Sequence, residues 1–182
     1  MDEQRLWAPW RIGYIAGERE AEATPPEPNA WPAGADRQCF MCRAAAAYAD
    51  KPAARRHNLV VDADEHAVAI LNRYPYNNGH LLVSPRRHVG ALDELNDAEH
   101  VAAMQTLSRF TRLLGELIRA EGFNIGLNLG RPAGAGVPGH LHWHLVPRWT
   151  GDSNFMPVTG DARVISQSLD ELWQVITQFK VD

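Results

Sequence analysis

The sequence predicts an α+β fold in which an antiparallel sheet packs against a long central helix and a C-terminal helix. Segments with the short apolar pattern of strands lie on both sides of residues 97–121, where apolar residues recur at helical spacing. The chain has 182 residues, of which 45% are hydrophobic and 22% charged, as in ordinary globular proteins. This length is most simply one main domain with a sizeable core.

Three strands are predicted before the long helix, at residues 58–61, 67–71 and 80–84. The second and third are separated by the sequence NRYPYNNG, which is rich in residues that favour turns. We therefore expect a turn to join these two strands.

The long helix is expected to begin at Asn96 or Asp97, with Glu99 in its first turn and Gly122 as its stop. Five apolar residues can share one face of this helix: Val101, Met104, Leu107, Leu114 and Ile118.

Two more strands, at residues 123–130 and 140–147, are predicted after the helix and are joined by the glycine-rich sequence GRPAGAGVPG. A last helical pattern follows near the C-terminus and carries four apolar residues: Leu169, Leu172, Trp173 and Ile176.

The N-terminal segment divides into two parts before the main domain, which we place at residues 39–182. Residues 1–16 form a short aromatic arm, and Trp7, Trp10 and Tyr14 are expected to dock onto the domain or a partner subunit. Residues 17–38 are rich in Pro, Ala, Glu and Gly without periodicity, which indicates a loop or linker.

Composition excludes several classes of protein. A net charge of −4 argues against generic binding to nucleic acid or to anionic membranes. No apolar run approaches the roughly 20 residues of a membrane helix, and the acidic start lacks the apolar segment of a secretion signal. With only two cysteines, a disulfide framework is not expected. We therefore expect a cytoplasmic protein.

Three histidines, His140, His142 and His144, alternate with Leu and Trp in the sequence HLHWHL. In a strand they project on one side, with neighbours about 6–7 Å apart. Because imidazole titrates near pH ~6.5, one ring can act as a neutral nucleophile while another offsets phosphate charge. The alternative is a set of half-buried structural histidines or an adventitious metal patch, but three in register favour a functional site.

The glycine-rich loop directly before these histidines strengthens that interpretation. Glycines such as Gly136 and Gly139 let the backbone approach a ligand and turn its N–H groups toward phosphate oxygens. We therefore expect both to contribute to substrate binding.

Cys39 and Cys42 form a CxxC pair whose thiolates can reach one metal ion. A structural zinc site, a redox dithiol and two incidental core thiols are all compatible with this pair. A thioredoxin-like site would need a strand-to-helix junction, which the Pro-rich stretch before Cys39 does not supply.

The sequence HLHWHLV resembles the signature of the histidine triad (HIT) superfamily of nucleotidyl hydrolases and transferases. LNRYPYNNGHLLVSPRRH resembles the other long element of that superfamily. WAPWR and PRWTGDSNFMPV are most similar to the branch of bacterial diadenosine tetraphosphate phosphorylase-like proteins. The resemblance covers residues 39–180 and the arm, and implies a HIT-like fold and a homodimer or higher homo-oligomer.

The resemblance also implies roles for individual residues. His142 would attack the α-phosphorus and hold the nucleotidyl group covalently, while His144 and His80 would contact the phosphates. Asn72 would bind the ribose or hold the nucleotide, and Asn128 would lie beside the phosphates. The chain departs from many HIT hydrolases before the first histidine, where VPG replaces polar residues and implies contacts from backbone N–H groups.

In zinc-bearing relatives of this superfamily, two histidines complete the site begun by a CxxC pair. The resemblance places them at His88 and His140, which with Cys39 and Cys42 would hold a structural zinc ion. Magnesium is expected only in company with a polyphosphate substrate.

The leading functional hypothesis is an enzyme that cleaves diadenosine tetraphosphate with inorganic phosphate to give ADP and ATP, through a nucleotidyl-histidine. A hydrolase would use water instead, and a sugar-phosphate nucleotidyltransferase or a non-catalytic nucleotide sensor are further alternatives. Arg148, Trp149 and Asn154 are candidates for shaping the acceptor site, but equally for packing or dimer contacts.

Overall fold

The computed structural model describes residues 26–152, 165 and 167–179. The predicted aromatic arm and the first part of the predicted linker lie outside these residues, as does Asn154. The elements in chain order are α2 (Phe40–Ala45), α3 (Lys51–His57), β1 (Val60–Ala63), β2 (Ala67–Leu71), β3 (Leu81–Pro85), a 3₁₀ turn (Leu92–Glu94), α4 (Asp97–Leu117), β4 (Gly122–Leu127), a second 3₁₀ turn (Arg131–Ala133), β5 (Trp143–Arg148) and α6 (Leu169–Gln178).

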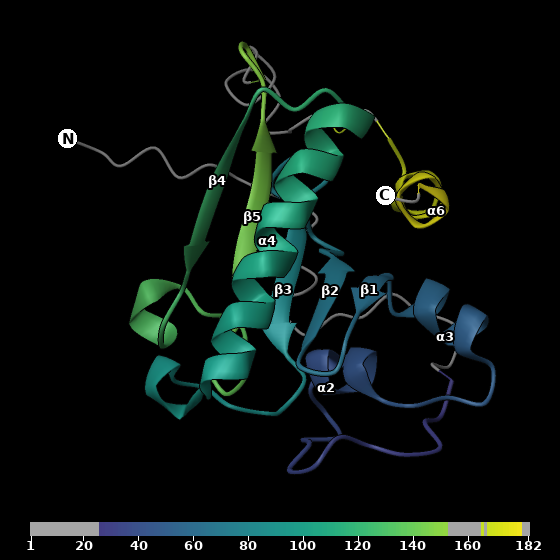
Figure 1. Ribbon diagram of the computed structural model, residues 1–182, viewed down its shortest axis with the longest axis vertical. Helices are drawn as coiled ribbons and strands as arrows, with labels where there is room; N and C mark the ends of the chain where they lie inside the picture. Colours follow the sequence, from purple (N-terminus) through teal and green to yellow (C-terminus); the bar gives the residue numbers. More distant parts are fainter. Residues whose placement is uncertain (1–25, 153–164, 166, 180–182) are drawn as a thin grey trace.

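The described strands form one antiparallel sheet in the order β1-β2-β3-β5-β4. The long helix α4 lies across one face of this sheet, with α6 beside β1, while α2 covers the opposite face (Figure 1). Strand β5 therefore lies inside the sheet between β3 and β4, and β4 forms an edge. The predicted α+β architecture is confirmed.

The hairpin of β2 and β3 follows the sequence pattern closely. Strand β2 occupies the predicted residues 67–71, whereas β3 begins one residue later than expected. Their register runs from Ala67 opposite Pro85 to Leu71 opposite Leu81, and every residue of both strands is buried. Such continuous burial requires cover on both sheet faces, which α4 and α2 provide.

Helix α4 begins with a capping box, in which the Asn96 side chain accepts from the Glu99 N–H and the Glu99 carboxylate accepts from the Asn96 N–H. The helix ends at Leu117, earlier than predicted, because Arg119 adopts a left-handed φ of 54°. Gly122 instead starts β4.

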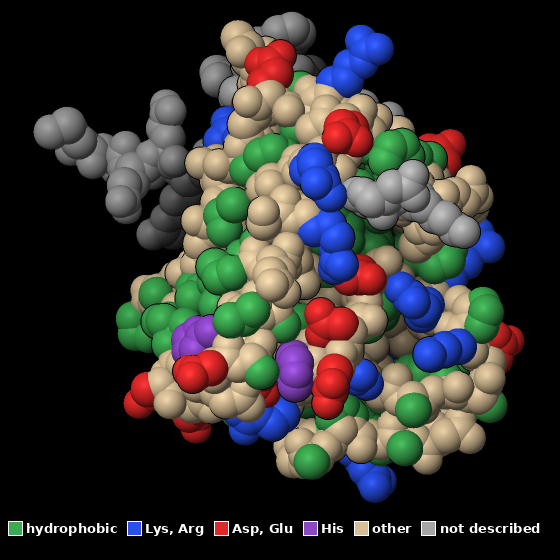
Figure 2. All heavy atoms as spheres, in the orientation of Figure 1, with side chains coloured by type: hydrophobic (Ala, Val, Ile, Leu, Met, Phe, Trp, Pro, Cys, Tyr) green, Lys and Arg blue, Asp and Glu red, His purple; other side chains and the backbone are tan. Residues whose placement is uncertain are grey.

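The predicted apolar face of α4 is wrong at its first two positions. Val101 and Met104 are 52% and 49% exposed, whereas Leu107 and Leu114 are buried. Small alanines take the positions that face the sheet in the first turns, so the buried face is rotated from the expected one. This face consists of Ala102, Ala103, Thr106, Leu107, Phe110, Leu113 and Leu114. On the outer face of the molecule, acidic and basic side chains are interspersed (Figure 2).

The second core lies under α2, on the face opposite α4. Cys39 and Cys42 pack there against apolar side chains of β1, β2 and β3. Trp31, from the described part of the predicted linker, joins this core, and the Arg43 guanidinium lies 5.3 Å from the centre of its ring. This segment is a loop tied to the domain by a bridge between Ala30 and Ala47.

Helix α6 packs as its sequence pattern predicts. Leu172 and Ile176 are buried in the core shared with α4, and Trp173 Nε1 donates to the Val60 carbonyl oxygen at 3.0 Å. Among the described residues, none of the helices has the length and apolar character to cross a bilayer.

Replacing Leu114 with Ala is expected to lower the free energy of unfolding by about 2–5 kcal/mol, because its fully buried side chain would leave a cavity. Met104→Ala is the matched control and should change it by less than about 0.5 kcal/mol, since this side chain is half exposed. Urea denaturation measures both. Equal losses would contradict the observed orientation of α4.

Candidate functional site

The stretch from His140 to His144 serves two neighbouring clusters on the sheet face opposite α4. Only His144 lies within β5, opposite Leu82 of β3, whereas His140 and His142 belong to the extended segment that leads into the strand. The predicted strand over residues 140–147 therefore starts three residues later. The predicted alternation holds, because the intervening residues are buried under α4: Leu141, Trp143 and Leu145.

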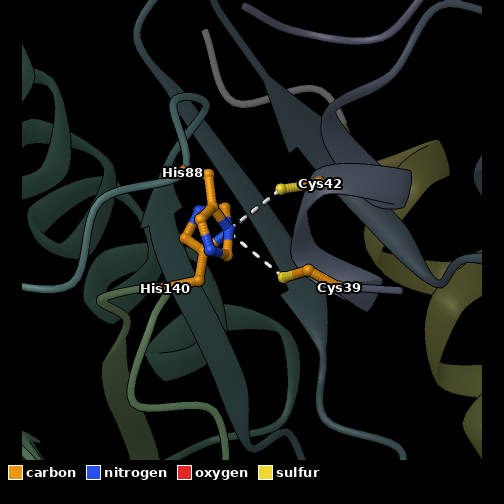
Figure 3. Close-up of side chains that lie close together, drawn as sticks. All are labelled: Cys39, Cys42, His88 and His140. Atoms are coloured by element: carbon orange, nitrogen blue, oxygen red, sulfur yellow. Dashed lines mark hydrogen bonds between the residues drawn. The ribbon is translucent and has the colours of Figure 1, made fainter. Parts of the chain in front are cut away.

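The first cluster brings together Cys39, Cys42, His88 and His140, as the sequence analysis expected (Figure 3). One potential ligand atom from each residue lies within 4.8 Å of all the others. The Cys39 sulfur lies 3.3 Å from His140 Nδ1, and the Cys42 sulfur lies 3.3 Å from His88 Nδ1 and 3.5 Å from His140 Nδ1. The four side chains can therefore hold one metal ion.

Close backbone contacts bring the two histidines of this cluster together. His88 follows β3, and His140 follows the glycine-rich loop. The Leu141 N–H donates to the Val89 carbonyl oxygen at 2.7 Å, which joins the two segments. At Gly90, a Cβ atom would lie 2.8 Å from the Pro138 carbonyl oxygen, a distance that only glycine tolerates.

The environment of His140 leaves one ring nitrogen available to a metal. Its Nε2 lies 2.9 Å from the Pro85 carbonyl oxygen and must carry the proton, because a carbonyl only accepts. Nδ1 therefore carries a lone pair, which points toward the two thiols. Burial lowers the pKa of His140 to about 4, so the ring is neutral at physiological pH.

Both thiols are buried, so deprotonating them to thiolates is costly unless a cation lies nearby. Burial, together with the neighbouring Cys39, raises the pKa of Cys42 to about 12. A bound cation offsets this cost and favours the thiolate. Two sulfur and two imidazole donors are the set preferred by a tetrahedral transition-metal ion, so the residues present fit such an ion.

The second cluster contains His142 and His144, whose ring centres lie 5.1 Å apart. His142 Nδ1 lies 2.8 Å from the His140 carbonyl oxygen and therefore carries the proton. Burial lowers the pKa of His142, partly opposed by this hydrogen bond. The neutral ring is thus favoured, with an unprotonated Nε2.

His80 lies behind His144 and is only 1% exposed. Its Nε2 is 3.0 Å from His144 Nδ1, and its ring stacks on Tyr76 with centres 4.9 Å apart. The Asn72 amide nitrogen lies 3.2 Å from His80 Nδ1, while the Asn128 amide nitrogen lies 3.5 Å from His144 Nε2. The structure therefore brings together His142, His144, His80, Asn72 and Asn128.

A groove of about 580 Å³ runs along β4 and β5 and is bordered by His144. Because His144, Val146 and Arg148 alternate along β5, they share one face and lie along this groove. Residues of β4 and its neighbours, among them three asparagines and two aromatic residues, complete its walls: Tyr76, Asn77, Phe123, Asn124, Ile125, Gly126, Leu127 and Asn128.

The glycine-rich loop also makes room for the first cluster, which the sequence analysis did not predict. A Cβ atom on Gly139 would lie 3.2 Å from His88 Nε2, so this glycine makes room for a histidine of the first cluster. Gly136 is exposed in the same loop. Val137 packs against the core around the cysteines, which accounts for an apolar residue at that position.

The segment after β5 forms a hydrogen-bonded unit around Asp152 that sequence reasoning missed. Arg148 donates twice to this carboxylate, at 2.6 and 2.9 Å, and once to Asn124. Asn77 also donates to Asp152, and these donors, with Arg148 first, lower the pKa of Asp152 to about 2. Trp149 Nε1 donates to the Ile118 carbonyl oxygen. Arg148 and Trp149 thus both make hydrogen bonds within the domain, and Arg148 also lines the groove.

Comparisons with known proteins agree with this geometry. The profile of the HIT domain family matches residues 53–151. The AP-4-A phosphorylase of Mycobacterium tuberculosis (strain H37Rv) is 39% identical over 172 residues, which cover 91% of this chain and 78% of that protein. The asymmetrical bis(5'-nucleosyl)-tetraphosphatase of Schizosaccharomyces pombe is 33% identical over 86 residues, covering 47% of each protein.

A similar solved structure is that of a zinc-bound histidine triad family protein from Mycobacterium smegmatis. It superposes with a TM-score of 0.55 at 26% identity, over 66% of this chain and 81% of that chain.

The chain belongs to the HIT domain family, because the family profile spans more than half of it and the tuberculosis relative aligns over nearly all of it. The predicted HIT-like fold and the prediction of a HIT-family enzyme are thereby confirmed.

Replacing Gly90 with Ala is expected to lower the free energy of unfolding by about 1–3 kcal/mol, because the added methyl group forces the Pro138 backbone away. Since this contact holds His88 near His140, the variant should also bind metal more weakly. Gly122→Ala is the control, because open space surrounds its Cβ position. Denaturation and competition with a chromophoric chelator measure the two effects, and an unchanged Gly90→Ala protein would contradict them.

Proposed function

We propose that this protein cleaves dinucleoside polyphosphates through a nucleotidyl-histidine formed on His142. The observation that carries the proposal is the unprotonated Nε2 of His142, whose ring centre lies 5.1 Å from that of His144, a residue of the groove wall. The named activities of the tuberculosis and fission yeast relatives support this substrate class.

In the proposed reaction, the lone pair of His142 Nε2 attacks the α-phosphorus of diadenosine tetraphosphate. The bond from that phosphorus to the bridging oxygen breaks, so ATP leaves and AMP remains bound to nitrogen. An oxygen of inorganic phosphate then replaces the nitrogen and releases ADP. A covalent intermediate of this kind divides one difficult displacement into two easier ones.

Other residues of the cluster surround the reacting phosphate in this proposal. His144 and Asn128 donate hydrogen bonds to its oxygens, where negative charge develops in the transition state. Asn72 binds the ribose, and Gly136 and Gly139 bring backbone N–H groups toward the phosphates. His80 belongs to this machinery through its contact with His144.

The phosphorylase is the first choice for the acceptor, because the tuberculosis relative named for this activity aligns over 91% of the chain. Water as acceptor gives AMP instead of ADP, and the tetraphosphatase relative keeps this hydrolase as the second candidate. A homodimer and a cytoplasmic location remain predictions from the sequence.

For the cysteine and histidine cluster we propose a structural zinc ion, supported by its donor set and by the zinc-bound relative. The four ligands would join α2, the segment after β3 and the segment before β5. Bound zinc would supply a cross-link between these segments. Magnesium would enter only with the polyphosphate substrate.

Incubation with diadenosine tetraphosphate, with and without phosphate, tests the function. ADP and ATP formed only with phosphate support the phosphorylase, AMP and ATP formed with water alone support the hydrolase, and no turnover contradicts both.

His142→Ala should lower kcat by at least about 10³-fold, because no nucleophile remains. Its affinity for the nucleotide, measured by calorimetry, should change little. An active alanine variant would contradict the covalent role.

Elemental analysis of the purified protein is expected to find about one zinc ion per chain. Cys39→Ser combined with Cys42→Ser should abolish zinc binding and lower thermal stability, because binding free energy contributes to folding. His100→Ala is the control, since this exposed histidine lies on the outside of α4. Full zinc content in the double serine variant would refute the site.

A further inference from the structure

His80 is a polar side chain in a buried position, and the partners of its Nδ1 define where its proton lies. The backbone N–H of Tyr76 donates to His80 Nδ1 at 3.0 Å. A nitrogen that accepts an N–H hydrogen bond carries no proton of its own. This contact therefore favours Nε2 as the site of the proton of a neutral His80.

Asn72 reinforces this assignment. Its amide oxygen accepts from the backbone N–H of Tyr74 at 3.0 Å, which sets the orientation of the amide. The amide nitrogen then faces His80 Nδ1 at 3.2 Å and donates to it. Two donors from the NRYPYN turn thus converge on the same ring nitrogen, and both oppose a proton there.

The assignment extends from His80 to His144. With its proton on Nε2, His80 donates to His144 Nδ1 at 3.0 Å. His144 accepts at Nδ1, so its own proton lies on Nε2. His80 thus receives the Tyr76 N–H directly and the Asn72 amide, which the Tyr74 N–H orients, and it donates in turn to His144 at the border of the groove.

In this tautomer, His144 and Asn128 present two hydrogen-bond donors side by side. The Asn128 amide nitrogen and His144 Nε2 lie 3.5 Å apart, and both are donors. Two donors side by side do not stabilise each other, but they suit a shared acceptor such as an anionic oxygen. A phosphate oxygen beside His142 meets that requirement.

We propose that His80 is a positioning residue that holds His144 in the Nε2-protonated tautomer, so that His144 and Asn128 act as paired donors to a phosphate oxygen. In this proposal His80 acts through His144 instead of the direct phosphate contact expected from the sequence, which its 1% exposure and its contact with His144 support. The phosphate part rests on the proposed function, whereas the tautomer does not.

The tautomer is read directly by NMR of the full-length zinc-loaded protein labelled with ¹⁵N histidine, without substrate. We expect His144 to show a protonated Nε2 and an unprotonated Nδ1. In His80→Gln the side-chain amide can keep a donor toward His144 and preserve this pattern. In His80→Leu the donor is lost, so Nδ1-protonated His144 should appear. A protonated Nδ1 in the wild type, or no change in His80→Leu, would overturn the proposal.

Asn72→Asp gives a second test in case His80→Leu fails to fold. The new carboxylate keeps the shape of the amide but presents an acceptor to His80 Nδ1, which should move the His80 proton and alter the His144 pattern. His100→Gln is the control and should leave the His144 signals unchanged, because His100 is exposed on α4. Signals of His144 that stay the same in Asn72→Asp would also contradict the proposed series of hydrogen bonds from Asn72 through His80 to His144.

Turnover provides a readout that separates this proposal from the function itself. His80→Leu should lower kcat by about 10²-fold, the usual effect of losing one oriented donor, and His80→Gln should restore most of it. If no substrate is cleaved by the wild type, the proposed function fails while the NMR result still decides the tautomer. Equal losses in the Leu and Gln variants would count against positioning.

Discussion

The hydrogen bond from His142 Nδ1 to the His140 carbonyl oxygen is the constraint on which the site depends. His140 is fully buried, with one ring nitrogen bound to the Pro85 carbonyl and the other directed at two thiols. Its backbone carbonyl is therefore rigidly held. Because that carbonyl takes the proton of His142 Nδ1, the lone pair of His142 is left at Nε2.

The segment from His140 to His144 thus joins a buried cluster that could hold a metal ion to the histidines proposed for catalysis. Burial lowers the pKa of both His140 and His142, so both rings favour the neutral form, which the proposed metal ligand and the proposed nucleophile require. The two clusters lie on the same sheet face, away from α4. The core under α4 can stabilise the sheet from one face, while the opposite face carries the two histidine clusters.

Local patterns in the sequence predict a good part of this arrangement. The apolar run of residues 67–71 is a strand at its predicted bounds, and α4 begins after Asn96, one of the two N-cap residues expected. The four members of the cysteine and histidine cluster could be named from motif resemblance. The rotated face of α4 could not, because Val101 and the buried alanines differ in burial through their distance from the sheet rather than through local preference.

The sequence by itself determined which residue types alternate, where the chain turns and which side chains are chemically able to act. Only the tertiary structure decided where the histidine rings carry their protons. Those positions depend on backbone carbonyl and N–H groups of Pro85, Tyr74 and Tyr76, which are the same in nearly every residue type and so cannot be recognised in a sequence. The tertiary structure also decided that Asp152 accepts hydrogen bonds from Arg148 and Asn77. Hydrogen bonds between segments distant in sequence, such as His80 with His144, have no periodicity from which they could be predicted.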